Sequence, residues 1–271
     1  MKREDLTANI GTVLSGIQLS SLSDAGKDQL ALFAAQRKVL VFRDQNFASL
    51  PIAEALKYGE YFGRLHIHPT SGAPKGHPEI HLVHRGADDR SGELLLETRT
   101  STVAWHSDVT YERQPPGTTF LYNLDIPSTG GDTLFVNQAE AYRRLSPGFR
   151  ERLHGLKAVH SGIEQAESAR SRDSVVRREP VTSIHPIVRT HPATGEKALF
   201  INPQCKYLVS GYPGSMPCSD SSVTRHIVGY KRDESDALLK FLYDHIAFGA
   251  DFQVRVKWAE NTVVVWDVSQ S

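Results

Sequence analysis

The pattern of apolar and polar positions predicts that the chain opens with a helix followed by a strand. Residues 23–38 begin with the N-cap candidate Ser23 and continue with Leu30, Leu32 and Phe33 at helical spacing. The next run, VLVFRD, is short, apolar and β-branched, as expected of a strand. The switch from helical spacing to a continuous apolar run marks the boundary between the two elements.

Three more helices are predicted further along the chain. They span residues 51–65, 137–145 and 233–246. The first of these has Pro51 in a first-turn position, where proline is favoured. In the last, one face is traced by Ala237, Leu238, Phe241, Leu242 and His245. Because His245 lies on this apolar face, we expect it to be a hydrogen-bonded histidine of the core.

Short strands are predicted before and after a polar segment in the middle of the chain. EIHLV precedes the polar residues 84–100, which are predicted to form a surface loop near the entrance of a site. From Val103 onward, strands alternate with turns, as in TTFLYNL, DTLFV, ALFIN, FQVRVKW and NTVVVW. Many short strands with few helices favour a mainly β (α+β) fold, a β-sandwich or jelly roll with helical buttresses, over a doubly wound sheet. Since no repeat or linker divides the sequence, residues 1–271 are predicted to form a single domain.

Composition narrows the function classes. The chain has 271 residues, and its 31 Lys and Arg balance its 31 Asp and Glu. A basic stripe typical of nucleic-acid or membrane-surface binding is not evident, and no apolar run reaches transmembrane length. The N-terminus lacks the apolar region of a secretory signal, so a cytoplasmic location is expected. In that compartment Cys205 and Cys218 are predicted to be free thiols.

The segment AWHSDVTY carries the strongest chemical signal. It places His106 and Asp108 two residues apart on a predicted strand, where both side chains point to the same face. An imidazole and a carboxylate together suit Fe(II), which is held by two histidines and one carboxylate in the facial triad. The alternative is an ordinary polar pair at a strand end, and for an isolated His-x-Asp motif that alternative is the more frequent.

Further sequence blocks change this balance. They are GRLHIHP, WHSDVTY, PSTGGDT, HPIVRTHPATGEKALFIN and ESDALLKFLYDHI. Together these blocks make the chain resemble the TauD/TfdA (taurine dioxygenase-like) family of Fe(II)- and 2-oxoglutarate-dependent dioxygenases, from about residue 8 to residue 267. The resemblance implies a double-stranded β-helix, or jelly roll, with the iron between its two sheets.

The resemblance assigns roles to individual residues. His106 and Asp108 would be two of the three iron ligands, and Thr133 would hydrogen-bond the distal carboxylate of 2-oxoglutarate. His68 and Trp105 would lie on the substrate side, although His68 could equally be a structural histidine in a His-Pro turn. The other ten histidines are expected to be structural or on the surface.

The substrate implied by the resemblance is a small organic acid. The resemblance is strongest to the branch that oxygenates sulfonates beside the sulfur and releases sulfite. Two positions that contact taurine in that branch differ here, because Ser71 replaces a Tyr and Thr102 lies near the place of an Asn. Another sulfonate or a carboxylate metabolite therefore remains open as the substrate. O2 would be consumed, succinate and CO2 would be released, and a homo-oligomer is expected.

In the family, a second iron-ligand His and an Arg that binds 2-oxoglutarate follow the Trp-Asp pair, which is Trp266 and Asp267 here. The sequence ends at Ser271, so we expect a domain that is incomplete at its C-terminus and has lost its last core strands. The competing function is therefore a truncated, non-catalytic relative. A cupin-type site is disfavoured, because such sites draw more histidines from neighbouring strands and would leave Thr133 without a role.

Residues 205–222 are predicted to be an insertion. They contain both cysteines and are rich in Ser, Gly and Pro, which suits a surface loop or lid. A retained intron is the alternative, because Cys205, Lys206 and Tyr207 can be encoded by a splice-donor sequence, and excision would restore the family pattern FINPQFTRHIVG. The residues after Asp267 can be explained in the same way. This hypothesis implies a eukaryotic source with short introns, such as a filamentous fungus.

Overall fold

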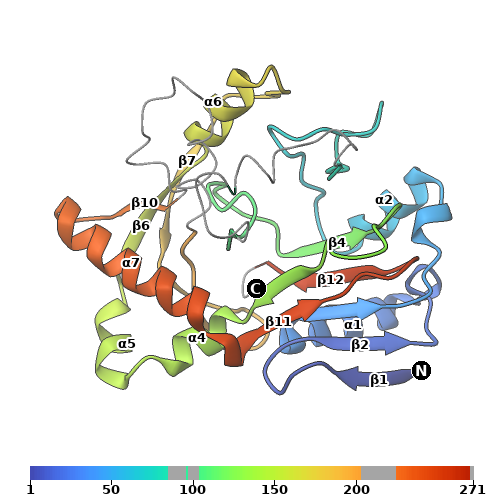
Figure 1. Ribbon diagram of the computed structural model, residues 1–271, viewed down its shortest axis with the longest axis horizontal. Coiled ribbons are helices and arrows are strands. Elements are labelled where there is room, and N and C mark those ends of the chain that lie inside the picture. The colour runs from blue at the N-terminus through green and yellow to red at the C-terminus, as the bar shows by residue number, and fades with distance from the viewer. Residues whose placement is uncertain (85–95, 97–103, 203–223, 269–271) are drawn as a thin grey trace.

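A computed structural model describes residues 1–84, 96, 104–202 and 224–268 (Figure 1). The predicted insertion at 205–222 and the proposed substrate residue Thr102 lie outside the described residues. Within the described ranges the chain combines several sheets with helices, which is the α+β class expected from the sequence.

A five-stranded sheet forms one half of the molecule (Figure 1). Its strands, in spatial order, are β1 (Lys2–Asp5), β2 (Thr12–Ser15), β3 (Val39–Phe42), β12 (Val263–Asp267) and β4 (Thr118–Tyr122). Every residue of β3 is buried, and so are Val263, Val264 and Val265 of β12. Because both faces of these central strands are covered, they appear in the sequence as continuous apolar runs rather than as an alternating pattern.

Each face of this sheet is covered by a different layer. Helices α1 (Asp24–Arg37) and α2 (Ile52–Glu60) enclose an apolar cluster that includes Leu30 and Tyr58. On the other side lies the antiparallel pair of β5 (Thr133–Val136) and β11 (Gln253–Val256). It packs Phe135 and Val254 against Val41 and Val264. The N-cap prediction for the first helix is confirmed, because Ser23 Oγ accepts a hydrogen bond from Gly26 N at 3.3 Å.

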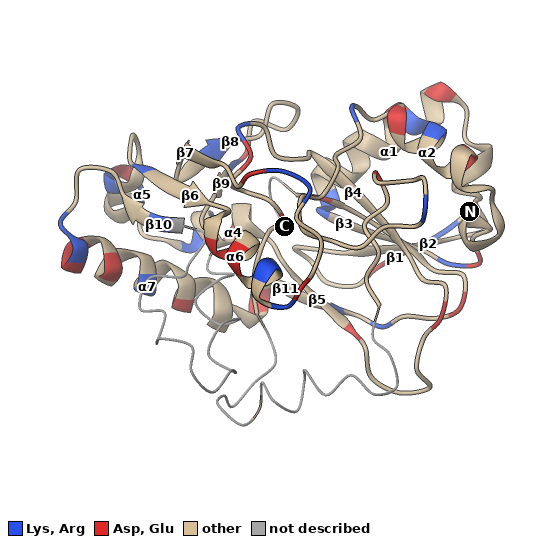
Figure 2. Cartoon of the chain, turned by 90° about the horizontal axis from the view of Figure 1, so that it is seen from above, with Lys and Arg blue, Asp and Glu red and all other residues tan. Residues whose placement is uncertain are grey.

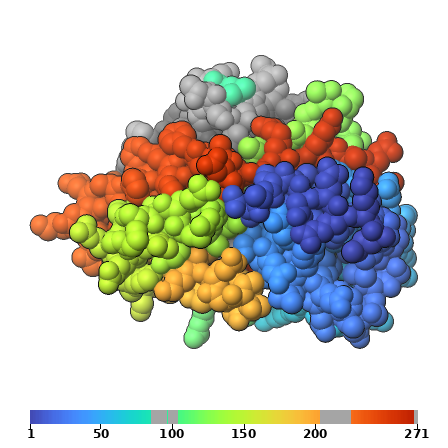
Figure 3. Space-filling view, turned by 90° about the horizontal axis from the view of Figure 1, so that it is seen from below, coloured from blue at the N-terminus to red at the C-terminus, as the bar shows by residue number. Residues whose placement is uncertain are grey.

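The second half of the molecule is built around smaller sheets and four helices. The strands are β6 (Lys157–Ser161), β7 (Thr182–Pro186) and β10 (Thr224–Ile227) in one sheet, and β8 (Val188–Thr190) and β9 (Lys197–Leu199) in another. The helices are α4 (Gln138–Arg144), α5 (Pro147–Leu153), α6 (Ile163–Ser171) and α7 (Arg232–Phe248). Short 3-10 turns lie at Leu19–Ser21 and Phe47–Ser49 in the first half and at Ala250–Phe252 after α7. Figure 3 shows that the two halves pack directly against each other.

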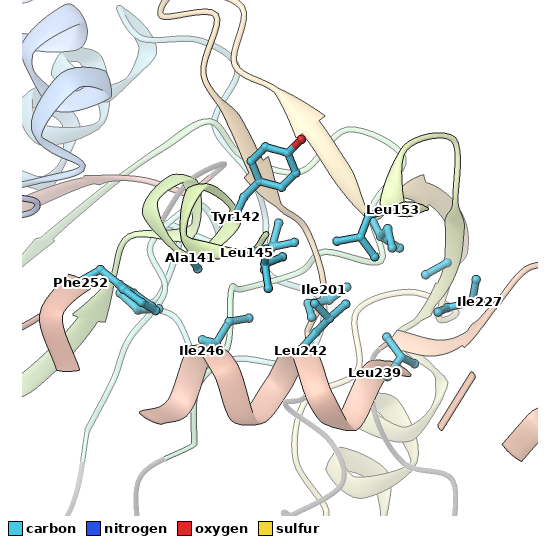
Figure 4. Close-up of a cluster of buried hydrophobic side chains, with 14 residues drawn as sticks. Ala141, Tyr142, Leu145, Leu153, Ile201, Ile227, Leu239, Leu242, Ile246 and Phe252 are labelled. Atoms are coloured by element: carbon cyan, nitrogen blue, oxygen red, sulfur yellow. The ribbon is translucent and has the colours of Figure 1, made fainter. Parts of the chain in front are cut away.

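Helix α7 supplies much of the core of this second half. Leu239, Leu242 and Ile246 project from α7 toward Ile201 and Ala141 (Figure 4). The prediction for His245 is confirmed as well, because its Nε2 lies 2.7 Å from the carbonyl oxygen of Ala141. The inward face nevertheless differs from the predicted one, because Leu242 is the one residue of that predicted face that is buried, and Phe241 is 48% exposed.

Two features of the sequence prediction need correction here. The strand predicted at EIHLV is wrong, because no strand is formed there. Gly76 has a positive φ of 84°, and Leu82 N bonds back to Gly72 O at 3.1 Å, so this segment follows turns. Helices α5 and α6 were not predicted: α5 is only seven residues long, and the sequence of α6 has only a weak apolar face.

Acidic and basic residues are interspersed along the helices and loops of the chain (Figure 2). This distribution agrees with the balance of charges in the sequence. Among the described residues, none of the helices combines the length and the apolar character needed to cross a membrane.

Candidate metal centre

His106 and Asp108 lie in a turn and not on a strand, so the strand predicted through this segment is wrong. Val109 has a positive φ of 48°, and Glu112 N donates to Val109 O at 2.9 Å. The backbone therefore reverses direction immediately after Asp108. The two side chains come together in an irregular segment that leads into this turn, and not through the period-two alternation of a strand.

The geometry of the pair nevertheless fits a shared metal ion. His106 Nε2 lies 3.5 Å from Asp108 Oδ1, and the two side chains are 41% and 38% exposed. Two ligand atoms that each lie about 2.1 Å from one ion can be at most about 4.2 Å apart, so this separation is compatible with joint coordination. Both side chains are accessible to an ion from solvent.

The second ring nitrogen of His106 supports the same assignment. Nδ1 lies 2.7 Å from the backbone carbonyl oxygen of Ala104, which can only accept a hydrogen bond. Nδ1 therefore carries a proton, which leaves Nε2 as the ring nitrogen that could bind a metal ion. Metal-binding histidines typically have their second nitrogen held in this way.

The described residues could supply two ligands of the triad that the resemblance implies. Within the ranges that the structure describes, no group of three or more His, Cys, Asp and Glu side chains is arranged to hold a metal ion. Imidazole nitrogen and carboxylate oxygen are ligand types that suit iron and related transition metals. The pair therefore fits Fe(II) in ligand type and geometry, as part of a larger coordination set.

His68 lies close to this pair. Its side chain is buried, and burial lowers the pKa of its imidazole to about 4, helped by the neighbouring His81 and opposed by the negative charge of Asp108. His68 Nδ1 accepts a hydrogen bond from Thr70 N at 3.2 Å, so Nε2 carries the proton of the neutral ring. His68 can therefore donate one hydrogen bond toward a ligand near Asp108.

Sequence analysis missed the position of His81, which was expected to be structural or on the surface. The ring centroids of His68 and His81 are 4.6 Å apart, and the charge of Asp108 also acts on His81. His66 stands on the other side of His68, with ring centroids 6.4 Å apart. No spacing in the sequence could have indicated the contact with His81, because the turns of residues 71–84 create it.

The structure places Thr133 at the start of a strand and Trp105 against an apolar cluster. Thr133 begins β5, and its Oγ1 accepts a hydrogen bond from Trp258 Nε1 at 3.0 Å rather than bonding to either proposed metal ligand in the described part of the chain. Trp105 is partly buried against the apolar cluster that contains Leu242. The roles proposed for these two residues remain predictions.

His160 allows a prediction about pH. It is fully buried, and burial lowers its pKa from 6.5 to about 3, with a smaller contribution from His185 and Arg189. Below about pH 6.5 the unfolded chain therefore binds a proton that the folded chain does not. The contribution of the neutral His160 ring to the free energy of unfolding is complete above pH 6.5 and is lost as pH falls toward 3. The slope of this loss is about 1.4 kcal/mol per pH unit near pH 5.

Urea unfolding at several pH values between 7 and 4.5 measures this slope. His160→Gln is expected to flatten the pH dependence of the free energy of unfolding by about one proton. Phe200→Leu is the matched control, because Phe200 stacks on the His160 ring with centroids 5.4 Å apart but does not titrate. It should destabilise the protein by a similar amount at each pH, and equal slopes for wild type and His160→Gln would contradict the prediction.

Comparisons with known proteins identify the family of the chain. A model of the family described as "Taurine catabolism dioxygenase TauD, TfdA family" matches residues 2–268. An alpha-ketoglutarate-dependent sulfonate dioxygenase of Saccharomyces cerevisiae is 42% identical over 267 residues, which are 98% of this chain and 60% of the yeast protein. An alkylsulfatase of Acinetobacter baylyi is 31% identical over 97% of this chain and 75% of its own length.

A solved structure confirms the predicted fold. The crystal structure of a taurine dioxygenase from Burkholderia xenovorans superposes with a TM-score of 0.72 and 28% sequence identity, covering 99% of this chain and 80% of that chain. The jelly-roll prediction is thereby confirmed. The chain spans about three fifths of the length of the yeast relative. From the family match and these likenesses, the chain belongs to the TauD/TfdA family of dioxygenases.

Proposed function

We propose that the protein is an Fe(II)- and 2-oxoglutarate-dependent dioxygenase that oxidises a small organic acid bearing a sulfonate group. The observation that carries the proposal is the His106–Asp108 pair, with its 3.5 Å separation and with the second nitrogen of His106 bonded to Ala104. Membership of the family supports the same chemistry, since alpha-ketoglutarate in the relatives' names is 2-oxoglutarate.

The residues of the chain would bind and orient the reactants. Nε2 of His106 and the carboxylate of Asp108 would hold the iron. Iron, when bound, supplies the redox chemistry that couples the oxidation of 2-oxoglutarate to succinate and CO2 with the oxygenation of a substrate by O2. The protein's contribution is to keep these ligands in place and to leave the remaining positions of the metal open.

Thr133 would bind the carboxylate of 2-oxoglutarate that lies away from the metal. An indole N–H can only donate, so the hydrogen bond from Trp258 makes Thr133 Oγ1 an acceptor at that contact. The hydroxyl proton of Thr133 is then available to a second partner. A carboxylate is a suitable acceptor, because a hydrogen bond to a charged oxygen is stronger than one to a neutral oxygen.

His68 would bind the acidic group of the substrate. Its ring is held by Thr70, and its Nε2–H is available for an anionic oxygen. Trp105 and Thr102 would contribute to the same substrate region, as the resemblance implies. A sulfonate is favoured over a carboxylate because the yeast relative is a sulfonate dioxygenase and the bacterial relative is an alkylsulfatase, both acting on sulfur oxyanions by name.

The competing function, a truncated and non-catalytic relative, is not supported by the names of these relatives. Small-molecule binding and consumption of O2 accompany the proposed chemistry. Assembly into a homo-oligomer remains a prediction from the resemblance.

Product analysis of the purified protein tests the proposal. The protein is incubated with Fe(II), 2-oxoglutarate and O2 together with one of a series of linear alkyl sulfonates, and succinate and sulfite are measured. We expect succinate and sulfite in equal amounts, and neither product when iron is left out. Carboxylates of the same chain length are the matched control. Succinate formed only with carboxylates would contradict the sulfonate assignment, and no substrate-dependent succinate at all would contradict the dioxygenase.

A further inference from the structure

The turn that carries Asp108 is attached to the rest of the protein by a buried polar network. Asn202 Nδ2 donates to Ser107 O at 2.5 Å and to Thr110 Oγ1 at 3.0 Å. Asn202 is fully buried, and Thr110 is only 1% exposed. The two attachment points lie on either side of Asp108 in the chain, so a single amide group holds both ends of the segment that presents the carboxylate.

The hydroxyl oxygen of Thr110 contacts two buried polar side chains. The Asn202 amide nitrogen can only donate, so Thr110 Oγ1 is the acceptor in that bond. His160 Nδ1 lies 3.1 Å from the same oxygen. Because burial keeps the pKa of His160 at about 3, its ring is neutral near pH 7 and one nitrogen can accept the Thr110 hydroxyl proton. The hydroxyl thus connects Asn202 on one side with His160 on the other.

Three aromatic rings lie beneath this network. His160 of β6, His185 of β7 and Phe200, which follows β9, have ring centroids 5.3 to 5.4 Å apart. His185 Nε2 lies 2.8 Å from Glu112 O, which is a third attachment point for the turn. The turn therefore packs against these rings. Thr110 connects the turn to the network, because its side chain contacts both Asn202 and His160.

We infer that Thr110 and Asn202 are positioning residues for the metal centre: their hydrogen bond holds the His106–Asp108 turn in the conformation that binds the ion. The inference rests on the proposed metal site. It explains why a polar network is buried at this place, where removing one partner would leave another buried polar group unsatisfied. Groups outside the direct ligands commonly tune metal affinity in this way.

Thr110→Val and Thr110→Ser form a matched pair for the test. Valine keeps the shape of threonine and removes the hydroxyl, whereas serine keeps the hydroxyl. Co(II) alone is titrated into each purified protein, and its affinity and visible absorption spectrum are recorded, because the spectrum reports the ligand geometry. We expect Thr110→Val to raise the Kd for Co(II) by about 10- to 100-fold and to change the spectrum. Thr110→Ser should retain the affinity and spectrum of the wild type.

A purely structural role would give a different result. Leu30→Ala, in the apolar cluster beneath α1, is expected to lower the unfolding midpoint without changing the Kd for Co(II). If Thr110→Val lowers the unfolding midpoint but keeps the Kd and spectrum of the wild type, the positioning role is overturned. Asn202→Ala removes the donor of the same hydrogen bond and gives an equivalent test if Thr110→Val does not fold.

The same titration separates this inference from the proposed function. If wild type and His106→Ala bind Co(II) equally, the proposed metal site is wrong and the inference is overturned with it. If His106→Ala abolishes binding while Thr110→Val and Asn202→Ala bind as the wild type does, the metal site stands and the positioning role alone is overturned.

Discussion

Replacing His106 by alanine is expected to lower the rate of succinate formation by at least about 10³-fold. A bound metal lowers the activation barrier by several kcal/mol, and each 1.4 kcal/mol is a factor of ten in rate. Asp108→Ala should have an effect of the same order. The two side chains are 3.5 Å apart and more than a third exposed, so neither is needed to fill the core. Succinate formation with Fe(II), 2-oxoglutarate and substrate present is the measurement.

The control for this prediction is His226→Ala. His226 is an exposed histidine on β10, and its removal should leave the rate unchanged. Circular dichroism of all three variants should match the wild type, since the side chains of both replaced ligands are more than a third exposed. A His106→Ala protein that retains more than a tenth of the wild-type rate would show that the metal is held elsewhere.

Replacing His191 by alanine is expected to lower the free energy of unfolding by about 3–5 kcal/mol. His191 Nε2 lies 2.8 Å from Asp267 Oδ2, and the two side chains are only 9% and 8% exposed. Nδ1 of the same ring accepts hydrogen bonds from Ala193 N and Thr194 N, so the Nε2 proton is directed at Asp267. Alanine would leave the carboxylate of Asp267 in a buried place without this donor.

The size of the expected effect also reflects where the pair lies. Asp267 ends β12 in the five-stranded sheet, and its backbone N–H donates to Lys38 O at 3.0 Å. His191 belongs to the turn between β8 and β9 in the other half of the molecule, and the side chain of Lys38 bonds to Glu196 of that turn. Loss of His191 would therefore loosen a connection between the two halves.

Urea unfolding followed by circular dichroism at pH 7 measures this effect. Arg170→Ala is the matched control, because Arg170 forms an exposed ion pair with Glu179 at 3.1 Å. Exposed pairs contribute about 0–1 kcal/mol, so this control should change stability little. If both variants lose the same small amount, the buried pair does not connect the two halves as the structure indicates.

The sequence predicted the positions of strands and helices best where a single element carries a buried run of apolar residues. The continuous apolar runs at β3 and β12 predicted strands, and both strands are covered on each face. Helical spacing predicted α7 itself, but its buried residues are Ser235, Leu239, Leu242 and Ile246, so the predicted apolar face was wrong except at Leu242. EIHLV failed because its β-forming residues stand between turns and have no partner strand among the described residues. Formation of a strand depends on pairing, which composition does not report.

The identity of the proposed ligands was evident from the sequence, whereas their arrangement was decided by tertiary structure. His106 and Asp108 could be chosen because a single residue separates them in the chain and their chemistry suits iron. The segment that carries them is held by hydrogen bonds from Asn202, which lies more than ninety positions away. The contact between His68 and His81 and the pair formed by His191 and Asp267 have the same origin. Periodicity encodes which side of one element is apolar, but contacts between distant segments arise only when separate elements pack on a common core.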